Sequence, residues 1–211
     1  MANHHISILT PIFFGSGTGA ATYYHLLAKG LQHQGIDLTI ISEQTNSPIN
    51  FDNCKYLGLF PTRTGKKKQL IRDLIGYAWQ NLQYLRLPRI FQKRQPNAVL
   101  VHTSFYNFPG IFPQVMKRAI AQKTPKQKYI ADVRDVLLPL KQVKYLSQYD
   151  EVIACSENVR QRLISGGLNP EKITDIPIPQ ETISVNSVEL ENLLTQLGLD
   201  QTPYIFYAGM I

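Results

Sequence analysis

The sequence predicts an α/β fold, a doubly wound parallel sheet of the Rossmann-like kind. Strand-like apolar segments alternate with segments of helical periodicity along most of the chain. The strand 36–41 has β-branched and apolar residues on both faces, and 98–101 is apolar throughout. Strands buried on both faces belong to parallel sheets that helices cover on each side. The 211 residues, 44% of them hydrophobic and 18% charged, suffice for one full domain and the start of another.

The first quarter of the chain follows the order strand, loop, helix, strand. Residues 5–10 read as a strand, and 11–19 form a glycine-rich loop. From Ala20 onward apolar residues recur at helical spacing, and Gly35 ends this helix in the manner of a C-terminal glycine. The segment 36–41 is the second strand, so residues 5–41 are expected to form a βαβ unit at the start of the domain.

Residues 63–94 form a strongly basic segment after a short predicted strand at 54–57. The segment holds nine Lys or Arg and one acid, while the whole chain has a net charge of +7, so the basicity is local. Its apolar residues fall at helical intervals, which predicts an amphipathic helix with a basic flank, interrupted at Pro88. A basic helix of this kind suits an anionic membrane surface, although a merely solvated basic face is a comparable alternative. The candidate membrane contacts are Lys66, Lys67, Lys68 and Arg72.

The remainder of the first domain continues the alternation of strands and helices. We expect strands at 98–101, 128–131, 151–155 and 172–176, and helices at 112–122, 138–149 and 157–165. Ser156 is a good N-cap for the last of these helices.

The domain prediction places a boundary near residue 180. Residues 1–180 are the Rossmann-like domain with the basic insert at 63–94, and 181–211 are a linker and the start of a truncated second domain. A helix is expected at 188–197 and a strand at 204–209, which we expect to be frayed because no partner strand follows it.

The glycine-rich loop is a candidate ligand site. Gly15, Gly17 and Gly19 lie before a helix N-terminus, where backbone can approach an anion closely. The string also fits the dinucleotide pattern G-x-G-x-x-A, with Glu43 as the ribose-binding acid. Against that interpretation, five residues separate the strand from Gly15, where the dinucleotide turn follows the strand at once, and Glu43 lies further from the glycines than the ribose-binding acid usually does. A loop without a ligand is the third interpretation.

Asp132, Arg134 and Asp135 follow the predicted strand 128–131. Open parallel sheets bind ligands at the carboxyl ends of their strands. An Arg held by carboxylates makes a fixed clamp for an anion or a hydroxyl, whereas a self-contained surface ion pair is the alternative.

His102 follows the strand 98–101, and Ser156 and Glu157 follow the strand 151–155. These residues share the same predicted edge of the sheet. A structural hydrogen-bonded His and a helix cap at Ser156 are the simpler interpretations, and a ligand contact is the functional one.

Several segments together resemble the N-terminal half of a retaining, two-Rossmann-domain (GT-B) glycosyltransferase of family 4. The matching segments include "ISILTPIFFGSGTGAATYYHLLAKGLQHQGIDLTIIS", "YIADVRDVLLP" and "YDEVIACSENVRQRLISGGLNPEKITDIPIP". The DxRD string, Asp132 to Asp135, looks like the variant of transferases in surface-polysaccharide assembly. The sequence departs from the family in two places. Arg134 stands where a sugar-contacting His is often found, and the segment 176–181, IPIPQE, has Gln-Glu after Ile-Pro where the family usually has Asn-Gly.

The resemblance implies sugar transfer from a nucleotide sugar to a glycan or lipid-linked acceptor, with the nucleotide sugar as a substrate and no tightly bound cofactor or metal. It implies Gly15, Gly17 and Gly19 in the cleft beside the donor phosphates. The other implied site residues are Arg134, Asp135 and His102 in catalysis and Asp132, Ser156 and Glu157 at the substrate.

The resemblance also implies that the donor-binding half, with its phosphate-binding cations and paired glutamates, lies beyond Ile211. This chain alone is therefore expected to be inactive without a separate or missing C-terminal donor domain. No apolar run could span a membrane and the two cysteines lie far apart, which favours a cytoplasmic protein with reduced thiols, free or peripheral on the inner membrane face. The alternatives are an NAD(P)-dependent enzyme and a non-catalytic, membrane-associated binding module; nucleic acid is not an expected partner.

Overall fold

The computed structural model describes residues 4–11, 19–43, 53–60, 78–107, 110–134, 138–178, 187–196 and 198. The chain divides into two compact units, Met1–Pro179 and Gln180–Ile211. In the second unit the described helix is α7, Ser187–Gln196. All other elements below belong to the first unit.

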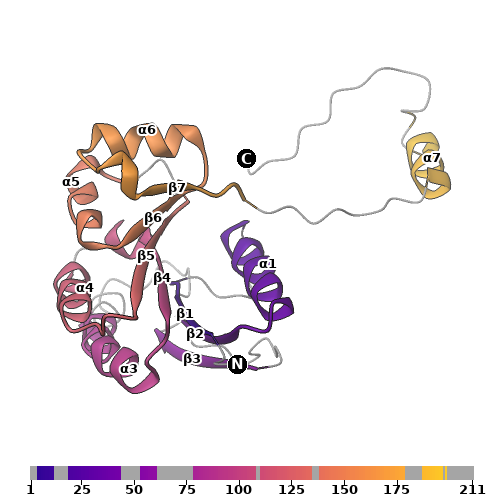
Figure 1. Ribbon diagram of the computed structural model, residues 1–211. Coiled ribbons are helices and arrows are strands. Elements are labelled where there is room, and N and C mark those ends of the chain that lie inside the picture. Colours follow the sequence, from indigo (N-terminus) through magenta and orange to yellow (C-terminus); the bar gives the residue numbers. More distant parts are fainter. Residues whose placement is uncertain are drawn as a thin grey trace. The chain divides into compact units, whose positions relative to one another are not determined.

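The first unit is built on one parallel sheet of seven strands in the order β3-β2-β1-β4-β5-β6-β7 (Figure 1). The strands are β1 His5–Leu9, β2 Asp37–Glu43, β3 Cys54–Phe60, β4 Ala98–His102, β5 Lys128–Val133, β6 Glu151–Ala154 and β7 Ile173–Asp175. Every neighbouring pair runs parallel. The predicted fold class is therefore confirmed.

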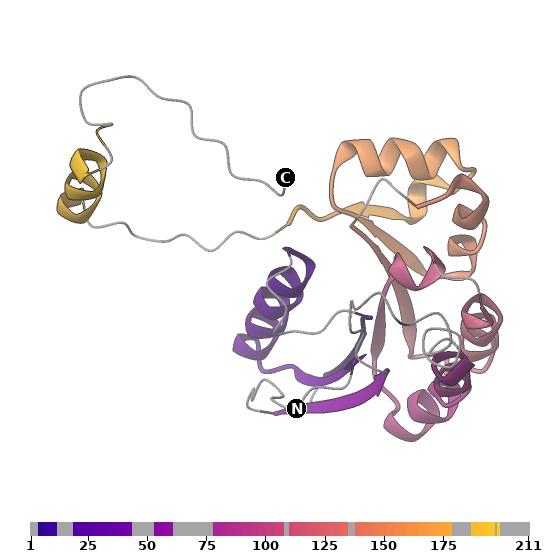
Figure 2. The same cartoon turned by 180° about the vertical axis from the view of Figure 1, so that it is seen from behind.

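Helices cover both faces of this sheet (Figures 1 and 2). One face packs against α1, Gly19–His33. The other face packs against α3 Leu87–Arg94, α4 Phe112–Ala121, α5 Leu140–Val143 and α6 Glu157–Ser165. Three short 3-10 turns complete the connections: η1 Thr103–Asn107, η2 Leu146–Gln148 and η3 Pro170–Lys172.

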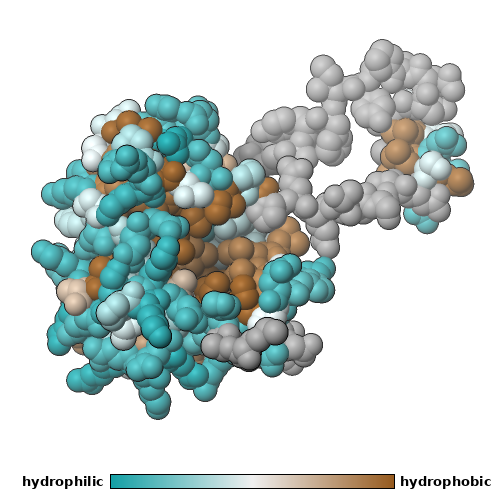
Figure 3. Space-filling view, viewed as in Figure 1, coloured by the Kyte–Doolittle hydropathy of each residue, from teal (hydrophilic) through white to brown (hydrophobic). Residues whose placement is uncertain are grey.

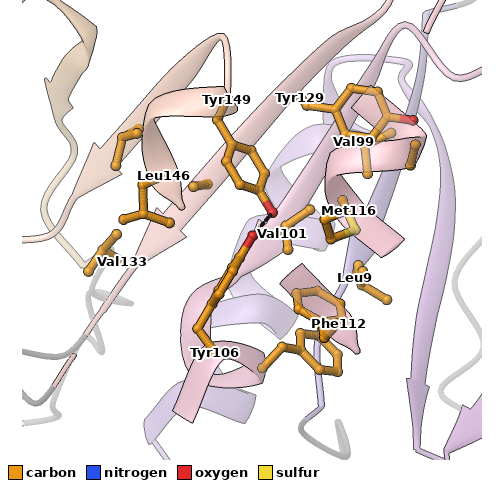
Figure 4. Close-up of a cluster of buried hydrophobic side chains, with 14 of the residues drawn as sticks. Leu9, Val99, Val101, Tyr106, Phe112, Met116, Tyr129, Val133, Leu146 and Tyr149 are labelled. Atoms are coloured by element: carbon orange, nitrogen blue, oxygen red, sulfur yellow. Dashed lines mark hydrogen bonds between the residues drawn. The ribbon is translucent and has the colours of Figure 1, made fainter. Parts of the chain in front are cut away.

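The larger core lies between β4–β6 and the helices α3, α4 and α6, and aromatic side chains fill much of it (Figure 4). Phe105 and Phe112 stack with ring centroids 4.6 Å apart. The hydroxyls of Tyr106 and Tyr149 lie 2.8 Å apart in a hydrogen bond, so both polar tips have a partner inside the apolar core. Such pairing removes most of the cost of burying a hydroxyl.

The second core lies under α1, on the opposite face of the sheet. Tyr24 and Ala28 of α1 are fully buried against Ile8, Leu38 and Ile40 of β1 and β2. This packing fixes the rotation of α1 and hence the direction in which its tyrosine hydroxyls point.

One of the predicted helices differs from the structure. The expected helix 138–149 is split into α5 and η2, with a turn at 144–145 between them. The N–H groups of Tyr145 and Tyr149 donate to the carbonyls three residues back, those of Gln142 and Leu146, each at 3.0 Å. The predicted interruption at Pro88 is confirmed: residues 78–84 are helical, 85–86 form a turn, and α3 begins at Leu87 with Pro88 in its first turn, where its missing N–H costs nothing. The predicted strand 204–209 lies outside the described residues, as do residues 61–77 of the basic segment.

Gly166 ends α6 at a point where a side chain has no room. A Cβ there would lie 2.8 Å from Val143 Cβ, Cγ1 and Cγ2, although the φ of −80° is open to any residue. Gly166→Ala should therefore lower the free energy of unfolding by about 1–3 kcal/mol through overpacking. Urea denaturation measures this directly.

Gly30, in the middle of α1, is the matched control because a Cβ there would meet nothing within 4 Å. Gly30→Ala should stabilise the protein by about 0.5–1 kcal/mol through helix propensity alone. Val143→Ala removes Cγ1 and Cγ2 but keeps Cβ, so in a double-mutant cycle it should recover part of the loss caused by Gly166→Ala. A cycle without coupling between positions 143 and 166 would refute the steric explanation.

Candidate functional site

The candidate site lies where β1 and β4 stand side by side in the centre of the sheet. The chain leaves β1 toward β2 on one side and leaves β4 toward β5 on the other, so this is the topological switch point. Open α/β sheets bind ligands outside the carboxyl ends of their strands at such a point. His102 of β4 stands directly opposite Asp132 of β5, which brings two of the predicted residues together.

Asp132 is the buried centre of this site, with no exposed surface. Its Oδ2 accepts a 2.7 Å hydrogen bond from the hydroxyl of Tyr24, and its Oδ1 lies 2.6 Å from Arg134 Nε. Its main-chain carbonyl accepts a 3.2 Å hydrogen bond from Thr103 Oγ1. Groups from α1, η1 and the end of β5 therefore converge on one carboxylate.

Arg134 connects three parts of the fold, and its side chain is only 6% exposed. Besides Asp132, its guanidinium donates from Nη1 to the carbonyl of Ile176 at 3.0 Å and from Nη2 to the hydroxyl of Tyr23. The guanidinium carbon also lies 3.7 Å from the centre of the Tyr23 ring. Two of its five N–H groups thus donate to protein acceptors while Nε pairs with a carboxylate, which holds the cation in one orientation.

The charges at this site are shaped by burial. Burial raises the pKa of Asp132, and the neighbouring Arg134 and the tyrosine hydroxyls oppose that rise. Burial also raises the pKa of Tyr23 and Tyr24, with the Asp132 charge acting in the same direction. Both tyrosines therefore serve as neutral hydroxyls at pH 7.

His102 is buried beside this group and is neutral at pH 7. Burial lowers its pKa to about 4, and the positive charge of Arg134 adds to that effect. Its Nδ1 makes a hydrogen bond with Ser104 Oγ and lies 3.3 Å from the Ser104 N–H, while the Tyr24 ring meets it edge-on with centroids 5.4 Å apart. A neutral imidazole can donate to or accept from a hydroxyl but cannot serve as a cation.

The low pKa of His102 predicts acid sensitivity. The unfolded chain binds a proton at His102 below pH 6.5, whereas the folded protein binds it only near pH 4. The contribution of His102 to the free energy of unfolding is therefore fully present above pH 6.5 and is lost as the pH drops toward 4, a loss of about 3 kcal/mol. Urea unfolding at pH 7 and pH 4.5 should show a smaller drop for His102→Gln than for the wild type. The exposed His33→Gln should keep the wild-type drop; equal drops in all three proteins would refute the assignment.

The structure brings His102, Asp132 and Arg134 together, but it gives Ser156 and Glu157 local partners instead. Ser156 Oγ accepts from the Val159 N–H at 3.4 Å as the N-cap of α6, as the capping pattern predicts. Glu157 Oε1 accepts from Gln161 Nε2 at 2.6 Å one turn along the same helix. Both residues are exposed.

Other predicted residues lie outside the described part of the chain. They are Gly15, Gly17, Asp135, Lys66, Lys67, Lys68 and Arg72. Gly19 is the exposed first residue of α1, and a Cβ there would meet nothing within 4 Å, so sterics do not require a glycine. Glu43 is the last residue of β2.

Sequence reasoning missed Tyr23, Tyr24 and Ser104. Tyr24 fits the apolar spacing of α1, which predicts no more than a core residue, yet its hydroxyl reaches a carboxylate 108 positions later in the chain. The available signal was weak: two adjacent tyrosines on a helix that follows a candidate ligand loop. Ser104 lies two residues after His102, a spacing that a side-chain hydrogen bond can span.

Within the ranges that the structure describes, no cluster of three His, Cys, Asp or Glu could hold a metal ion. Both cysteines are free thiols. The described helices include none long and apolar enough to cross a membrane. On the face shown in Figure 3, hydrophobic side chains gather over α1 and the strands next to it, while the surface over α3 and α4 is mainly hydrophilic.

Solved structures with the same fold include glycosyltransferases. A glycosyltransferase from Rickettsia africae ESF-5 is 15% identical with a TM-score of 0.59, over 94% of this chain and 50% of that one. Anabaena Alr3699/HepE in complex with UDP-glucose is 15% identical with a TM-score of 0.58, over 93% and 50%. The lipopolysaccharide outer core galactosyltransferase WaaB is 10% identical with a TM-score of 0.54, over 86% and 47%. This chain thus spans about half the length of those proteins.

No curated protein sequence matches the chain. The sequence profile described as Glycosyltransferase Family 4, by contrast, matches residues 17–179, which includes α1, the whole of the sheet after β1 and the polar group around Asp132. The profile and the seven-stranded GT-B-type sheet agree, and the chain belongs to glycosyltransferase family 4.

Proposed function

We propose that these 211 residues are the acceptor-binding half of a retaining glycosyltransferase. The whole protein would transfer a sugar from a nucleotide sugar to a glycan or lipid-linked acceptor, in the manner of the polysaccharide-assembly variant that Asp132 and Arg134 resemble. The observation that carries the proposal is the family 4 match over residues 17–179, within which a buried polar group occupies the switch point of the sheet.

In this proposal the polar group prepares one wall of the cleft for a sugar. Tyr24 and Arg134 hold the Asp132 carboxylate, and the ring of Tyr23 supports the guanidinium. The burial of Arg134 makes it chiefly a positioning residue that keeps positive potential at the strand ends, with Asp135 as a second orienting carboxylate. Fixed positive potential of this kind favours the negative charge that develops on the leaving diphosphate of the donor, while the carboxylates favour the positive charge of an oxocarbenium-like centre, both without reorganisation.

His102 would act as a neutral hydrogen-bonding group toward an acceptor hydroxyl. Its low pKa keeps the imidazole uncharged throughout the physiological range. Ser156 and Glu157 would contact the substrate only by giving up the local hydrogen bonds that they make in α6. We therefore rank them below His102 as substrate contacts.

The donor would be a nucleotide sugar bound as a substrate, with no tightly bound cofactor. Anabaena HepE was solved with UDP-glucose and with UDP and glucose. Gly15, Gly17 and Gly19 would lie beside the donor phosphates, because α1 begins at Gly19 and a helix N-terminus favours anions. The rest of the donor site would come from a separate or further C-terminal domain.

The protein would work in the cytoplasm, peripheral on the inner face of the membrane where lipid-linked acceptors are found. Support comes from the basic segment 63–94, including Lys66, Lys67, Lys68 and Arg72. Each Lys or Arg near an anionic bilayer contributes about 1 kcal/mol, so attachment through this segment would be loose and sensitive to salt.

Sugar transfer tests the proposal directly. The 211 residues alone should show no turnover with a panel of nucleotide sugars and a lipid-linked acceptor, and transfer should appear when a donor domain is supplied in frame or as a second polypeptide. Nuclear magnetic resonance of the product should show the anomeric configuration of the donor sugar. Robust turnover by the 211 residues alone, an inverted product, or NAD(P) binding in place of a nucleotide sugar would each contradict a stated part of the proposal.

A further inference from the structure

The helical segment 78–84 turns its polar side inward and its apolar side outward. Gln80 and Gln83 are only 7% and 6% exposed, whereas Trp79, Leu82 and Leu85 are 50%, 57% and 53% exposed. A surface helix of a globular protein normally has the opposite arrangement. The three exposed residues are spaced three apart, so they form one ridge, which we call the apolar ridge.

Contacts with the rest of the fold fix this inverted orientation. Asn81 Oδ1 accepts from the N–H of Ile111 at 3.0 Å, which ties the segment to the start of α4. The Tyr84 ring, 3% exposed, meets the rings of Phe105 and Phe112 edge-on with centroids 5.8 Å and 5.0 Å apart. Rotating the ridge inward would turn Tyr84 out of this core and break the hydrogen bond of Asn81, so the exposure of Trp79 is built into the fold.

A basic groove continues the apolar ridge between α3 and α4, which lie side by side on one flank of the sheet (Figure 1). The groove has a volume of about 430 Å³, and Leu85 belongs to both the ridge and the groove. The described residues that line it carry three guanidinium groups and no carboxylate. The arginines and the apolar residues of the lining are Arg86, Arg89 and Arg118 with Leu85, Pro88 and Val115.

We propose that the apolar ridge and the basic groove together are the surface by which the protein lies on an anionic bilayer. Trp79, Leu82 and Leu85 would enter the headgroup region, where an indole with one polar atom is well suited. The groove arginines would bind the lipid phosphates in bidentate fashion. This inference locates the membrane contact of the proposed function and rests on that membrane position.

Charge complementarity favours a bilayer as the occupant. The apolar ridge lies beside a groove that has arginines and no carboxylate among its described lining residues. This arrangement matches a bilayer, in which anionic headgroups lie above an apolar acyl-chain region. A single-stranded nucleic acid would need a series of stacking aromatic residues, and Trp79 is the only aromatic residue among the large hydrophobic residues that the described structure exposes.

Trp79 is the single tryptophan of the sequence, so its fluorescence reports on the ridge alone. With the 211-residue chain, vesicles of phosphatidylcholine containing a quarter phosphatidylglycerol should shift its emission to the blue, and brominated lipid should quench it. Vesicles of pure phosphatidylcholine should do neither. Vesicle binding with an unchanged Trp79 emission would overturn the proposal, because the contact would then lie elsewhere.

Matched variants test each half of the surface by vesicle sedimentation. Arg89→Gln with Arg118→Gln should weaken binding to the anionic vesicles roughly 25-fold, from about five-fold per cation. Leu82→Ser should weaken binding and shift the remaining Trp79 emission less. Lys29→Gln with Lys141→Gln, two exposed lysines on α1 and α5, removes the same charge and should cost less than the arginine pair. Equal losses for the two pairs would overturn the proposal.

Free phosphate and single-stranded RNA are the competing ligands for this surface. Complete competition by inorganic phosphate, or an equal Trp79 shift with single-stranded RNA, would overturn the assignment to a bilayer. Vesicle binding needs neither a donor domain nor a nucleotide sugar, so a failed transferase assay leaves it unaffected. Conversely, failed vesicle binding overturns the membrane contact and leaves transfer to a water-soluble acceptor as the test of the proposed function.

Discussion

Asp132→Asn is expected to lower the free energy of unfolding by about 3–5 kcal/mol at pH 7. The substitution keeps the shape of the side chain and lets the Tyr24 hydroxyl donate as before, but it removes the carboxylate that lies 2.6 Å from Arg134 Nε. Arg134 is only 6% exposed, so its charge would stay buried without a counter-ion. Urea denaturation of the 211-residue chain measures the effect.

Asp175→Asn is the control for Asp132→Asn, because Asp175 also pairs with an arginine, Arg160, at 3.2 Å but with side chains 48% and 24% exposed. A solvent-exposed pair of this kind contributes at most about 1 kcal/mol. Asp132→Asn combined with Arg134→Met should recover much of the loss, since no buried charge then remains. If Asp132→Asn costs no more than Asp175→Asn, Asp132 is protonated in the folded protein and the site holds no ion pair.

Arg134→Lys is expected to reduce turnover of the complete enzyme about 10²-fold, the size of effect seen when reacting groups are misplaced by about 1 Å. Lysine keeps the positive charge but lacks the planar fork. It cannot contact Asp132, the Ile176 carbonyl and the Tyr23 hydroxyl at once as the guanidinium does. Initial rates with saturating nucleotide sugar, together with melting temperatures, separate chemistry from stability.

Arg160→Lys supplies the matched control for this second substitution. Arg160 also donates to a main-chain carbonyl, that of Ile173 at 3.0 Å, and pairs with an aspartate, but it lies on α6 and has no proposed role in transfer. It should leave turnover within about two-fold of wild type. If Arg134→Lys unfolds the enzyme while turnover per folded molecule is unchanged, the cluster at Asp132 is structural only.

Local sequence pattern predicted most of the first unit. The apolar runs became β1, β2, β4, β5 and β6, and Gly35 does follow the end of α1 with a φ of +73°, where a side chain would be strained. The expected helix 138–149 was wrong in part, because periodicity does not show where hydrogen bonds change to carbonyls three residues back, as they do at Tyr145 and Tyr149.

The candidate site was also predicted only in part, because contacts between distant helices and strands leave no local pattern in the sequence. That Asp132 and His102 stand at the carboxyl ends of adjacent strands follows from strand order and can be inferred from sequence. That Tyr23 and Tyr24 reach across from α1 depends on how that helix packs on the sheet. Likewise, the inward glutamines of 78–84 reverse a pattern that sequence alone would interpret as a buried apolar face.

The sequence by itself determined the fold class, the order of strands and helices, and the residues at the strand ends, because periodicity, caps and turns act over a few neighbours. Only the tertiary structure decided which side chains meet. It set Arg134 between Asp132, Tyr23 and Ile176, buried it to 6% exposure, and lowered the pKa of His102 to about 4. Burial, and contacts between residues 42 and 111 positions apart, depend on how whole helices and strands pack together. The free energies that result from such packing leave no local pattern in the chain.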